Sequence, residues 1–147
     1  MFNPAPAVRK IDHKKMRRVL IVDAIAVHRV VMSSLVSGIN PFITFEQASS
    51  VAEAISTLGR GHFDAVVADW NLPGQGGDVL LKWIRARAHF NRLPFIMVSS
   101  SADNQDIIHA FMTLGVDAYV IKPFKAQDLY QKLVTTFDNR SPEGGAP

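Results

Sequence analysis

The sequence has 147 residues, of which 48% are apolar and 20% charged, and it contains no cysteine. This length suits one domain that buries a core without disulfides, and the missing cysteines exclude thiolate chemistry. No apolar run approaches the roughly eighteen residues of a membrane span, and the first residues lack the order of a secretory signal. We therefore expect a cytoplasmic protein with no membrane span.

The net charge of +3 is unevenly distributed along the chain. Residues 1–18 carry six lysines and arginines and one acid, whereas the remainder carries ten basic and twelve acidic residues. The pattern predicts a basic arm, residues 1–17, on a slightly acidic domain, not a basic DNA-binding surface. A solvated extension is the simplest interpretation of the arm. An electrostatic contact with an acidic protein, a nucleotide or an anionic membrane is the alternative.

After the arm, the sequence alternates between strand and helix patterns. Short apolar runs predict strands at residues 19–22, 42–45, 65–68, 95–98 and 118–121. Apolar residues at helical spacing predict helices at residues 25–36, 50–58, 78–88, 103–114 and 125–137. Gly38 and Gly115 are expected to end the first and fourth helices, because glycine is common just after a helix. Regular alternation predicts an α/β fold, a five-stranded parallel sheet with helices on both faces.

Polar residues follow four of the predicted strands. Asp23 follows the first, Asp69 the third, Ser99 the fourth and Lys122 the fifth. In an open parallel sheet, ligands bind beyond the carboxyl ends of the strands. We therefore expect these four side chains to converge on one crevice.

These segments carry a resemblance to a known family. Residues 19–23, 66–73, 94–100 and 119–124 resemble, in order and spacing, the receiver domains of response regulators. The resemblance covers residues 18–138 and leaves residues 139–147 as a flexible tail. It implies the flavodoxin-like (βα)5 fold of that family, with strand order 2-1-3-4-5 and a cis peptide between Lys122 and Pro123.

The resemblance also implies a phosphoryl-transfer site. Asp69 would accept a phosphoryl group from a histidine kinase or a histidine phosphotransfer protein, while Lys122 and Ser99 would contact the phosphoryl oxygens. Such transfer depends mainly on positioning and on positive charge around the phosphoryl group. Mg²⁺ would be held by Asp23, Asp69 and the backbone carbonyl of Asn71, since this ion prefers hard oxygen ligands.

Position 24 departs from the family pattern. Receiver domains usually carry two adjacent acids after the first strand, and this chain has Asp23 followed by Ala24. Loss of a group that supports a metal typically weakens binding or activity by about 10–100-fold. Either Asp23 binds Mg²⁺ directly, or the chain is a pseudo-receiver that acts as an interaction module without phosphorylation.

The resemblance implies that phosphorylation signals by changing the surface that binds a target protein. The Ser99 hydroxyl moves toward the phosphoryl group, Tyr119 turns inward, and the face formed by the fourth helix, fifth strand and fifth helix binds an unidentified target protein. The chain has no DNA-binding domain after residue 137, so we expect output by protein binding in trans. Gln127-Asp128-Leu129 lacks the arginine that DNA-binding relatives place there, which favours a monomer.

An enzymatic function is disfavoured. Phosphatases of the haloacid dehalogenase type need a second aspartate two residues after the nucleophile, and Asn71 occupies that position. At most, we expect the chain to catalyse its own phosphorylation and dephosphorylation on Asp69.

Overall fold

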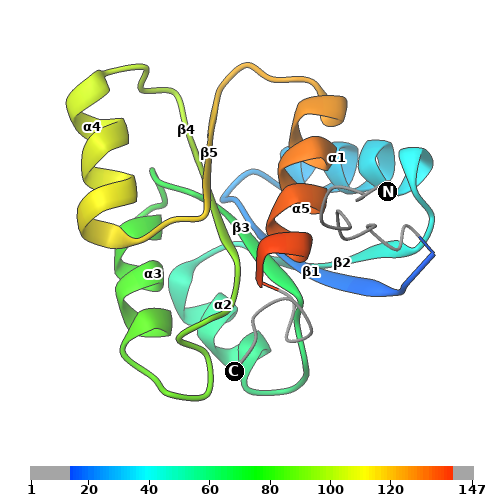
Figure 1. Cartoon of the computed structure of the whole chain (residues 1–147), viewed down its shortest axis with the longest axis horizontal. Helices are drawn as coiled ribbons and strands as arrows, with labels where there is room; N and C mark the ends of the chain where they lie inside the picture. The colour runs from blue at the N-terminus through cyan, green and yellow to red at the C-terminus, as the bar shows by residue number, and fades with distance from the viewer. Residues whose placement is uncertain (1–13, 141–147) are drawn as a thin grey trace, which may run out of the picture.

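The computed structural model describes residues 14–140, with side chains through residue 138. Its centre is a five-stranded parallel sheet of order β2-β1-β3-β4-β5, which confirms the expected α/β fold and strand order (Figure 1). The strands are β1 (Arg17–Val22), β2 (Ile43–Ala48), β3 (Ala65–Asp69), β4 (Phe95–Ser99) and β5 (Ala118–Ile121).

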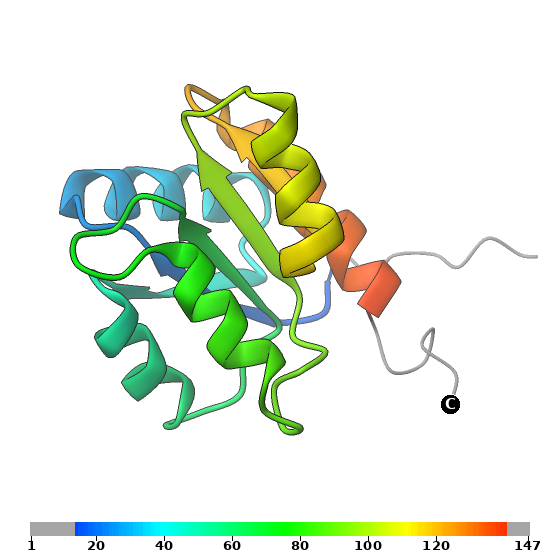
Figure 2. The same cartoon turned by 90° about the vertical axis from the view of Figure 1, so that its left-hand side faces the viewer.

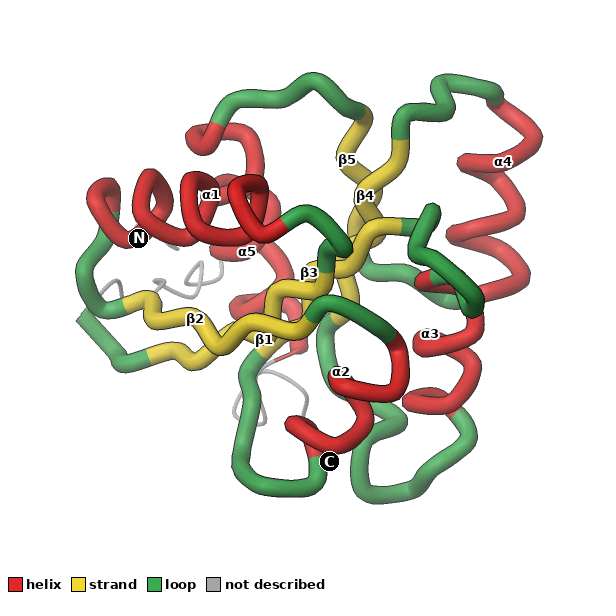
Figure 3. Tube along the Cα trace, turned by 180° about the vertical axis from the view of Figure 1, so that it is seen from behind, coloured by secondary structure: helices red, strands yellow, loops and turns green. Residues whose placement is uncertain are grey.

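Helices cover both faces of the sheet, as the alternating pattern predicts. The helices are α1 (Ala26–Ile39), α2 (Val51–Leu58), α3 (Gly77–Arg85), α4 (Asn104–His109) and α5 (Ala126–Arg140). A π-helical segment, Ala110–Leu114, continues α4. Helices α1 and α5 lie on one face, and α2, α3 and α4 lie on the other (Figures 1 and 2). The same two layers are seen from behind in Figure 3.

The inner strands β3 and β4 and the second half of β1 are mostly apolar because both of their faces are buried, whereas the edge strand β2 carries exposed polar residues. Side chains alternate across a strand, so Leu20 and Val22 of β1 face the core under α2 and α3, whereas Val19 and Ile21 face the core under α1 and α5. All five residues of β3 and all five of β4 are buried. The sheet is therefore a rigid platform for the residues at its ends.

Some predicted boundaries were wrong. Helix α1 does not end at Gly38 but continues to Ile39, because Val36 anchors its last turn in the core and an interior glycine costs only about 1 kcal/mol. Gly115 does end the fourth helical element, with a left-handed φ of 79°. Arg17, assigned to the arm, begins β1, and α5 extends past residue 137 to Arg140.

The predictions for the two ends of the chain mostly concern residues that the structure does not describe. Residues 1–13 of the basic arm and residues 141–147 of the tail lie outside the described residues. Within residues 14–140, no helix combines the length and apolar character that crossing a bilayer requires. The Lys122-Pro123 peptide is cis, as expected.

Candidate functional site

Four polar side chains meet at the carboxyl edge of the sheet. Asp69 ends β3, Ser99 ends β4, and Asp23 and Lys122 directly follow β1 and β5. The exposed fractions of Asp23, Asp69 and Ser99 are 9%, 8% and 2%. The Lys122 ammonium nitrogen lies 2.5 Å from Asp69 Oδ2 and 3.8 Å from Asp23 Oδ2. The convergence predicted from the strand ends is therefore present, with one cation between two carboxylates.

Hydrogen bonds fix both oxygens of the Asp69 carboxylate. The backbone N–H of Asn71 donates to Oδ1 at 3.1 Å, and the Lys122 ammonium group donates to Oδ2. The backbone N–H of Trp70 donates to the Val98 carbonyl at 2.8 Å and so ties the residue after Asp69 to β4. A carboxylate held in this way is a preoriented nucleophile or cation ligand.

Asp23 has a different set of partners. Its Oδ1 accepts a hydrogen bond from the Ile25 N–H at 2.8 Å, and its Oδ2 lies 3.3 Å from His28 Nδ1. The Arg29 guanidinium group donates to the Asp23 carbonyl at 2.5 Å. Sequence reasoning missed His28 and Arg29. Their spacing of five and six residues after Asp23, on the first turn of a helix that starts beside it, was the available signal.

Comparison with known proteins decides the family. The family model for the response regulator receiver domain matches residues 19–134. The chain belongs to this family. It is 37% identical over 124 residues to chemotaxis protein CheY-3 of Vibrio cholerae, a match that covers 84% of this chain and 94% of the relative. It is 36% identical over 121 residues to chemotaxis protein CheY of Pseudomonas aeruginosa, with 82% and 96% covered.

Solved structures of the family share this receiver domain's fold. The crystal structure of a response regulator receiver domain protein from Methanospirillum hungatei has a TM-score of 0.77 at 24% identity, covering 88% of this chain and all of that one. The chemotaxis response regulator CheY4 of Vibrio cholerae has a TM-score of 0.75 at 22% identity, covering 83% and 99%. Receiver domains are signalling domains rather than enzymes in the ordinary sense, and their family partners are histidine kinases.

Receiver domains in general bind Mg²⁺ at this acidic pocket, and the residues present fit such an ion in reduced number. The carboxylates of Asp23 and Asp69 are near enough to share one ammonium group, and the Asn71 main chain adjoins Asp69. Within residues 14–138 no group of three or more histidine, aspartate or glutamate side chains could hold a metal. Two carboxylates and a carbonyl suit Mg²⁺, which usually keeps several waters.

The two predicted switch residues lie close to the acidic pocket. The Ser99 hydroxyl oxygen accepts a hydrogen bond from the Ser101 N–H at 3.1 Å. Tyr119 is 8% exposed, its hydroxyl donates to the Ser101 carbonyl at 3.0 Å, and its ring packs edge-on against Trp70. Tyr119 therefore lies inward, held by Ser101 and Trp70.

An apolar cavity of about 620 Å³ adjoins the acceptor. Asp23, Asp69 and Lys122 form its polar end. Its apolar lining comes from α1, from strands β1, β3 and β4, from α5 and from the connection between β5 and α5, and includes Val27, Val31, Met32, Pro123 and Phe124. Val27 and Val31 are 60% and 46% exposed, so the apolar periodicity of this helix faces outward rather than into the core.

Proposed function

We propose that this receiver domain accepts a phosphoryl group on Asp69 from a histidine kinase or a histidine phosphotransfer protein and passes the signal on by binding a target protein. The observation that carries the proposal is the Lys122 ammonium group at 2.5 Å from the buried Asp69 carboxylate. A buried carboxylate beside a fixed cation at the carboxyl edge of a parallel sheet suits in-line attack on an incoming phosphoryl group.

Each residue of the pocket would have its own role in the transfer of the phosphoryl group. An Asp69 carboxylate oxygen forms the new O–P bond while the P–N bond to the donor histidine breaks and the electron pair leaves with the imidazole. Lys122 offsets negative charge on the phosphoryl oxygens, and the Ser99 hydroxyl, once released from Ser101 N–H, donates to one of them. The Asn71 N–H already donates toward Asp69 and holds the attacking carboxylate in place.

Mg²⁺ would supply further positive charge at this site. Asp23, Asp69 and the Asn71 carbonyl are the residues proposed to hold it. Because the Ala24 side chain carries no oxygen, we propose that Asp23 contributes a direct ligand in its place. Asp23 is suited to that role because its carboxylate already lies within 3.8 Å of the Lys122 ammonium nitrogen. His28 and Arg29 would keep its orientation fixed.

The outward apolar stripe of α1 supports docking of the phosphoryl donor beside Asp69. Val27, Val30, Val31 and Leu35 are each between 46% and 60% exposed. Contiguous exposed apolar surface marks interaction sites on soluble proteins. A helical donor that covers this stripe would bring its phosphohistidine to the polar end of the adjoining cavity.

Output through the face formed by α4, β5 and α5 is supported by a second exposed apolar set. Met112, Ile108, Phe111 and Ile121 are 81%, 59%, 42% and 39% exposed. These residues belong to α4, its π-helical continuation and the edge strand β5, which α4 and α5 flank in Figure 1. Burial of such side chains against a partner is favourable by about 25 cal/mol per Å².

The alternative proposal is a pseudo-receiver that binds partners without phosphorylation. Ala24 favours it, because the pocket has lost one carboxylate and Lys122 already pairs with the two that remain. A divalent cation would have to compete with that ammonium group. Under either proposal the receiver unit is the predicted range 18–138 enlarged to include Arg17 of β1 and the last residues of α5, to Arg140, and it acts as a cytoplasmic monomer.

Tryptophan fluorescence discriminates the two proposals. Trp70 follows Asp69 and packs against Tyr119 and His109, so a ligand on Asp69 changes its surroundings. Trp83 packs against Phe90 and Arg87, which line no part of the acidic pocket, and provides a constant background. We expect saturable changes on addition of Mg²⁺ and then of beryllofluoride, a mimic of the phosphoryl group.

The control for this titration is Asp69→Asn, which keeps the shape of the side chain and removes its charge. Both changes should be absent in this variant. No change in the parent chain, even at Mg²⁺ concentrations raised about 100-fold to allow for the lost ligand, would favour the pseudo-receiver. A phosphate-retardation gel then checks that a silent tryptophan does not conceal phosphorylation.

A further inference from the structure

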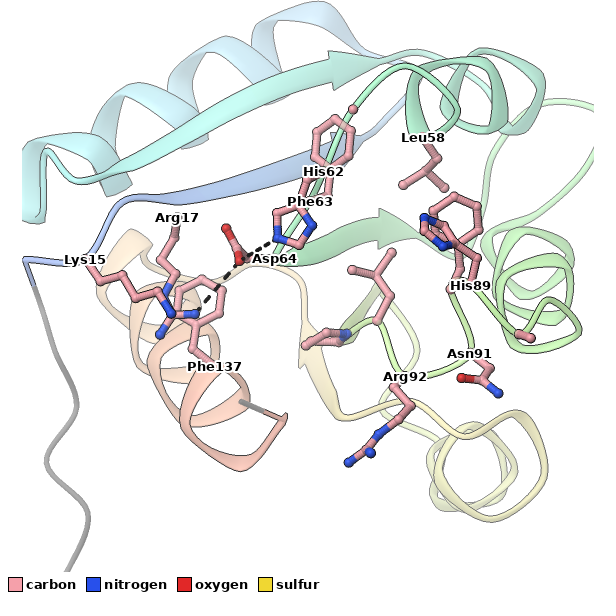
Figure 4. Close-up of a pocket in the computed structure, with 15 residues that line it drawn as sticks. Lys15, Arg17, Leu58, His62, Phe63, Asp64, His89, Asn91, Arg92 and Phe137 are labelled. Carbon is pink, nitrogen blue, oxygen red and sulfur yellow. Dashed lines mark hydrogen bonds and ion pairs between the residues drawn. The ribbon is translucent and has the colours of Figure 1, made fainter. Parts of the chain in front are cut away.

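A second large cavity lies at the opposite edge of the sheet, where the strands begin. It has a volume of about 660 Å³ and is drawn in Figure 4. The start of β1, the connection into β3, the connection from α3 to β4 and the end of α5 all contribute to its lining. Ligand-binding pockets typically measure about 300–1,000 Å³, so this cavity is large enough for a small organic molecule.

Positive charge predominates in the lining of this cavity. Lys15, Arg17 and Arg92 line it together with a single acid, Asp64. The Asp64 carboxylate is already engaged: it accepts a hydrogen bond from the Arg18 N–H at 2.8 Å and lies 3.9 Å from an Arg17 nitrogen and 3.3 Å from a nitrogen of His62 (Figure 4).

Two of the three cations, Lys15 and Arg92, form no ion pair with an acidic side chain of the described residues, unlike Arg17. Both residues are exposed. They reach the cavity from different elements, Lys15 from the segment before β1 and Arg92 from the connection before β4 (Figure 4). Figure 4 draws them on different sides of the cavity, Lys15 beside Arg17 and Arg92 beside Asn91, so a ligand must extend across the cavity to meet both charges.

The lining also carries apolar and aromatic side chains, beside the polar residues His62, His89 and Asn91. Phe90 is only partly buried, and the edge of its ring packs against His89 with 4.7 Å between the ring centroids. Phe137 is buried, and the Arg17 guanidinium group covers its ring with 4.8 Å from ring centroid to guanidinium carbon, so this ring is not accessible to a ligand. Aromatic rings stack with flat heterocycles, and arginine adds cation–π attraction. The cavity therefore offers a flat ligand apolar contact beside its cations.

We propose that this cavity binds a nucleotide, with the base against the Phe90 and His89 side and the phosphates between Lys15 and Arg92. An inorganic phosphate would leave most of the volume and the aromatic lining unused. A nucleotide uses both the charge and the rings, because it joins phosphates to a flat base. Asp64 immediately precedes β3 and Asp69 ends it, so five residues of strand, about 16 Å, separate this site from the acceptor. The nucleotide would thus be a second input to the domain.

Isothermal titration calorimetry on the full chain tests this proposal with ATP, AMP, adenosine and inorganic tripolyphosphate as probes. We expect ATP to bind most tightly, with adenosine and tripolyphosphate each weaker, because each lacks one half of the recognised chemistry. Absence of binding by both nucleotides at concentrations up to about 1 mM would overturn the proposal.

Charge reversals locate the site. Lys15→Glu and Arg92→Glu should each weaken ATP binding at least about tenfold, because a charge-assisted hydrogen bond is replaced by repulsion. The matched control is Lys132→Glu, an exposed position on α5 that does not line the cavity. Lys15 and Arg92 are both exposed, so these variants should unfold at the same melting temperature as the parent chain. Arg92→Gln removes the positive charge without adding a negative one, and so separates loss of charge from charge reversal.

Three further outcomes decide the interpretation. Tripolyphosphate binding as tight as ATP, with Lys132→Glu as damaging as Arg92→Glu, would indicate unspecific attraction and overturn the proposal. Poly-glutamate that binds more tightly than ATP would assign the surface to an acidic protein and also overturn it. The Asp69→Asn variant should still bind ATP as the parent chain does. The test of the nucleotide site therefore does not depend on whether Asp69 is phosphorylated.

Discussion

Asp23 and Asp69 share the Lys122 ammonium group, and the position next to Asp23 is an exposed alanine. At the scale of single residues this gives the pocket two negative charges and one positive charge. A second acid after β1 would add another negative charge and another oxygen, and both would favour a divalent cation over the ammonium group. The identity of residue 24 therefore governs how strongly this pocket attracts Mg²⁺.

Restoring the missing acid should strengthen Mg²⁺ binding. We expect Ala24→Asp to raise the Mg²⁺ affinity by about 10–100-fold, the size of effect typical for groups that support a metal site. The measurement is the midpoint of the Trp70 fluorescence titration. Ala26→Asp, which adds the same charge at an exposed position two residues away, is the control and should change the midpoint much less. Equal effects of the two variants would attribute the gain to net charge alone.

The site residues differed in how far the sequence could predict them. Asp23, Asp69, Ser99 and Lys122 were predictable because a parallel sheet brings its strand ends together. The contacts of His28 and Arg29 with Asp23 were not, since they depend on where the first turn of α1 begins. The inward position of Tyr119 was also not predictable, because a hydrogen bond to Ser101 and a ring contact with Trp70 determine it.

At the scale of elements, replacing glycine by alanine should change the free energy of unfolding in opposite directions at two positions, Gly38 and Gly77. Gly38 is the penultimate residue of α1, and a Cβ atom added there would meet nothing within 4 Å. Glycine in a helix interior is destabilising by about 0.5–1 kcal/mol relative to alanine. We therefore expect Gly38→Ala to raise the free energy of unfolding by that amount in urea denaturation. A decrease would mean that the helix needs glycine there for a reason outside its own backbone.

Gly77 begins α3 directly beneath the acceptor. A Cβ atom added there would collide with the backbone carbonyl oxygen of Asp69 and come within 3.2 Å of Met97 Sδ. Overpacking of this kind costs about 1–3 kcal/mol, so Gly77→Ala should lower the free energy of unfolding by that much. It should also weaken the beryllofluoride response, because the Asp69 backbone must shift. An unchanged unfolding curve would contradict the close packing of α3 on the end of β3.

Helix α1 illustrates the limit of periodicity as a guide to structure. The spacing of its apolar residues predicted a helix correctly, but it could not reveal that most of these residues face outward. A helix with apolar residues on several sides can pack any one of these sides against the sheet. Because α5 covers part of β1 and β3, it determines which side of α1 packs into the core and which side stays exposed. The exposed stripe is therefore a tertiary property that local sequence does not determine.

At the scale of the whole molecule, the parallel sheet separates two sites at its two edges. The carboxyl edge holds the acidic pocket, and the amino edge holds the basic cavity. The sequence indicated the first through polar residues at strand ends. It gave no comparable signal for the second, because Lys15, Asp64 and Arg92 are scattered over nearly eighty positions and read individually as surface charge.

The most direct test of the central claim is intact-mass spectrometry of the full chain after incubation with Mg²⁺ and acetyl phosphate, a small phosphoryl donor. The account predicts that the parent chain gains the mass of one phosphoryl group, that Ala24→Asp gains it at lower Mg²⁺ concentration, and that Asp69→Asn gains nothing. An unmodified parent chain beside a modified Ala24→Asp variant would contradict phosphorylation of this chain and establish it as a pseudo-receiver.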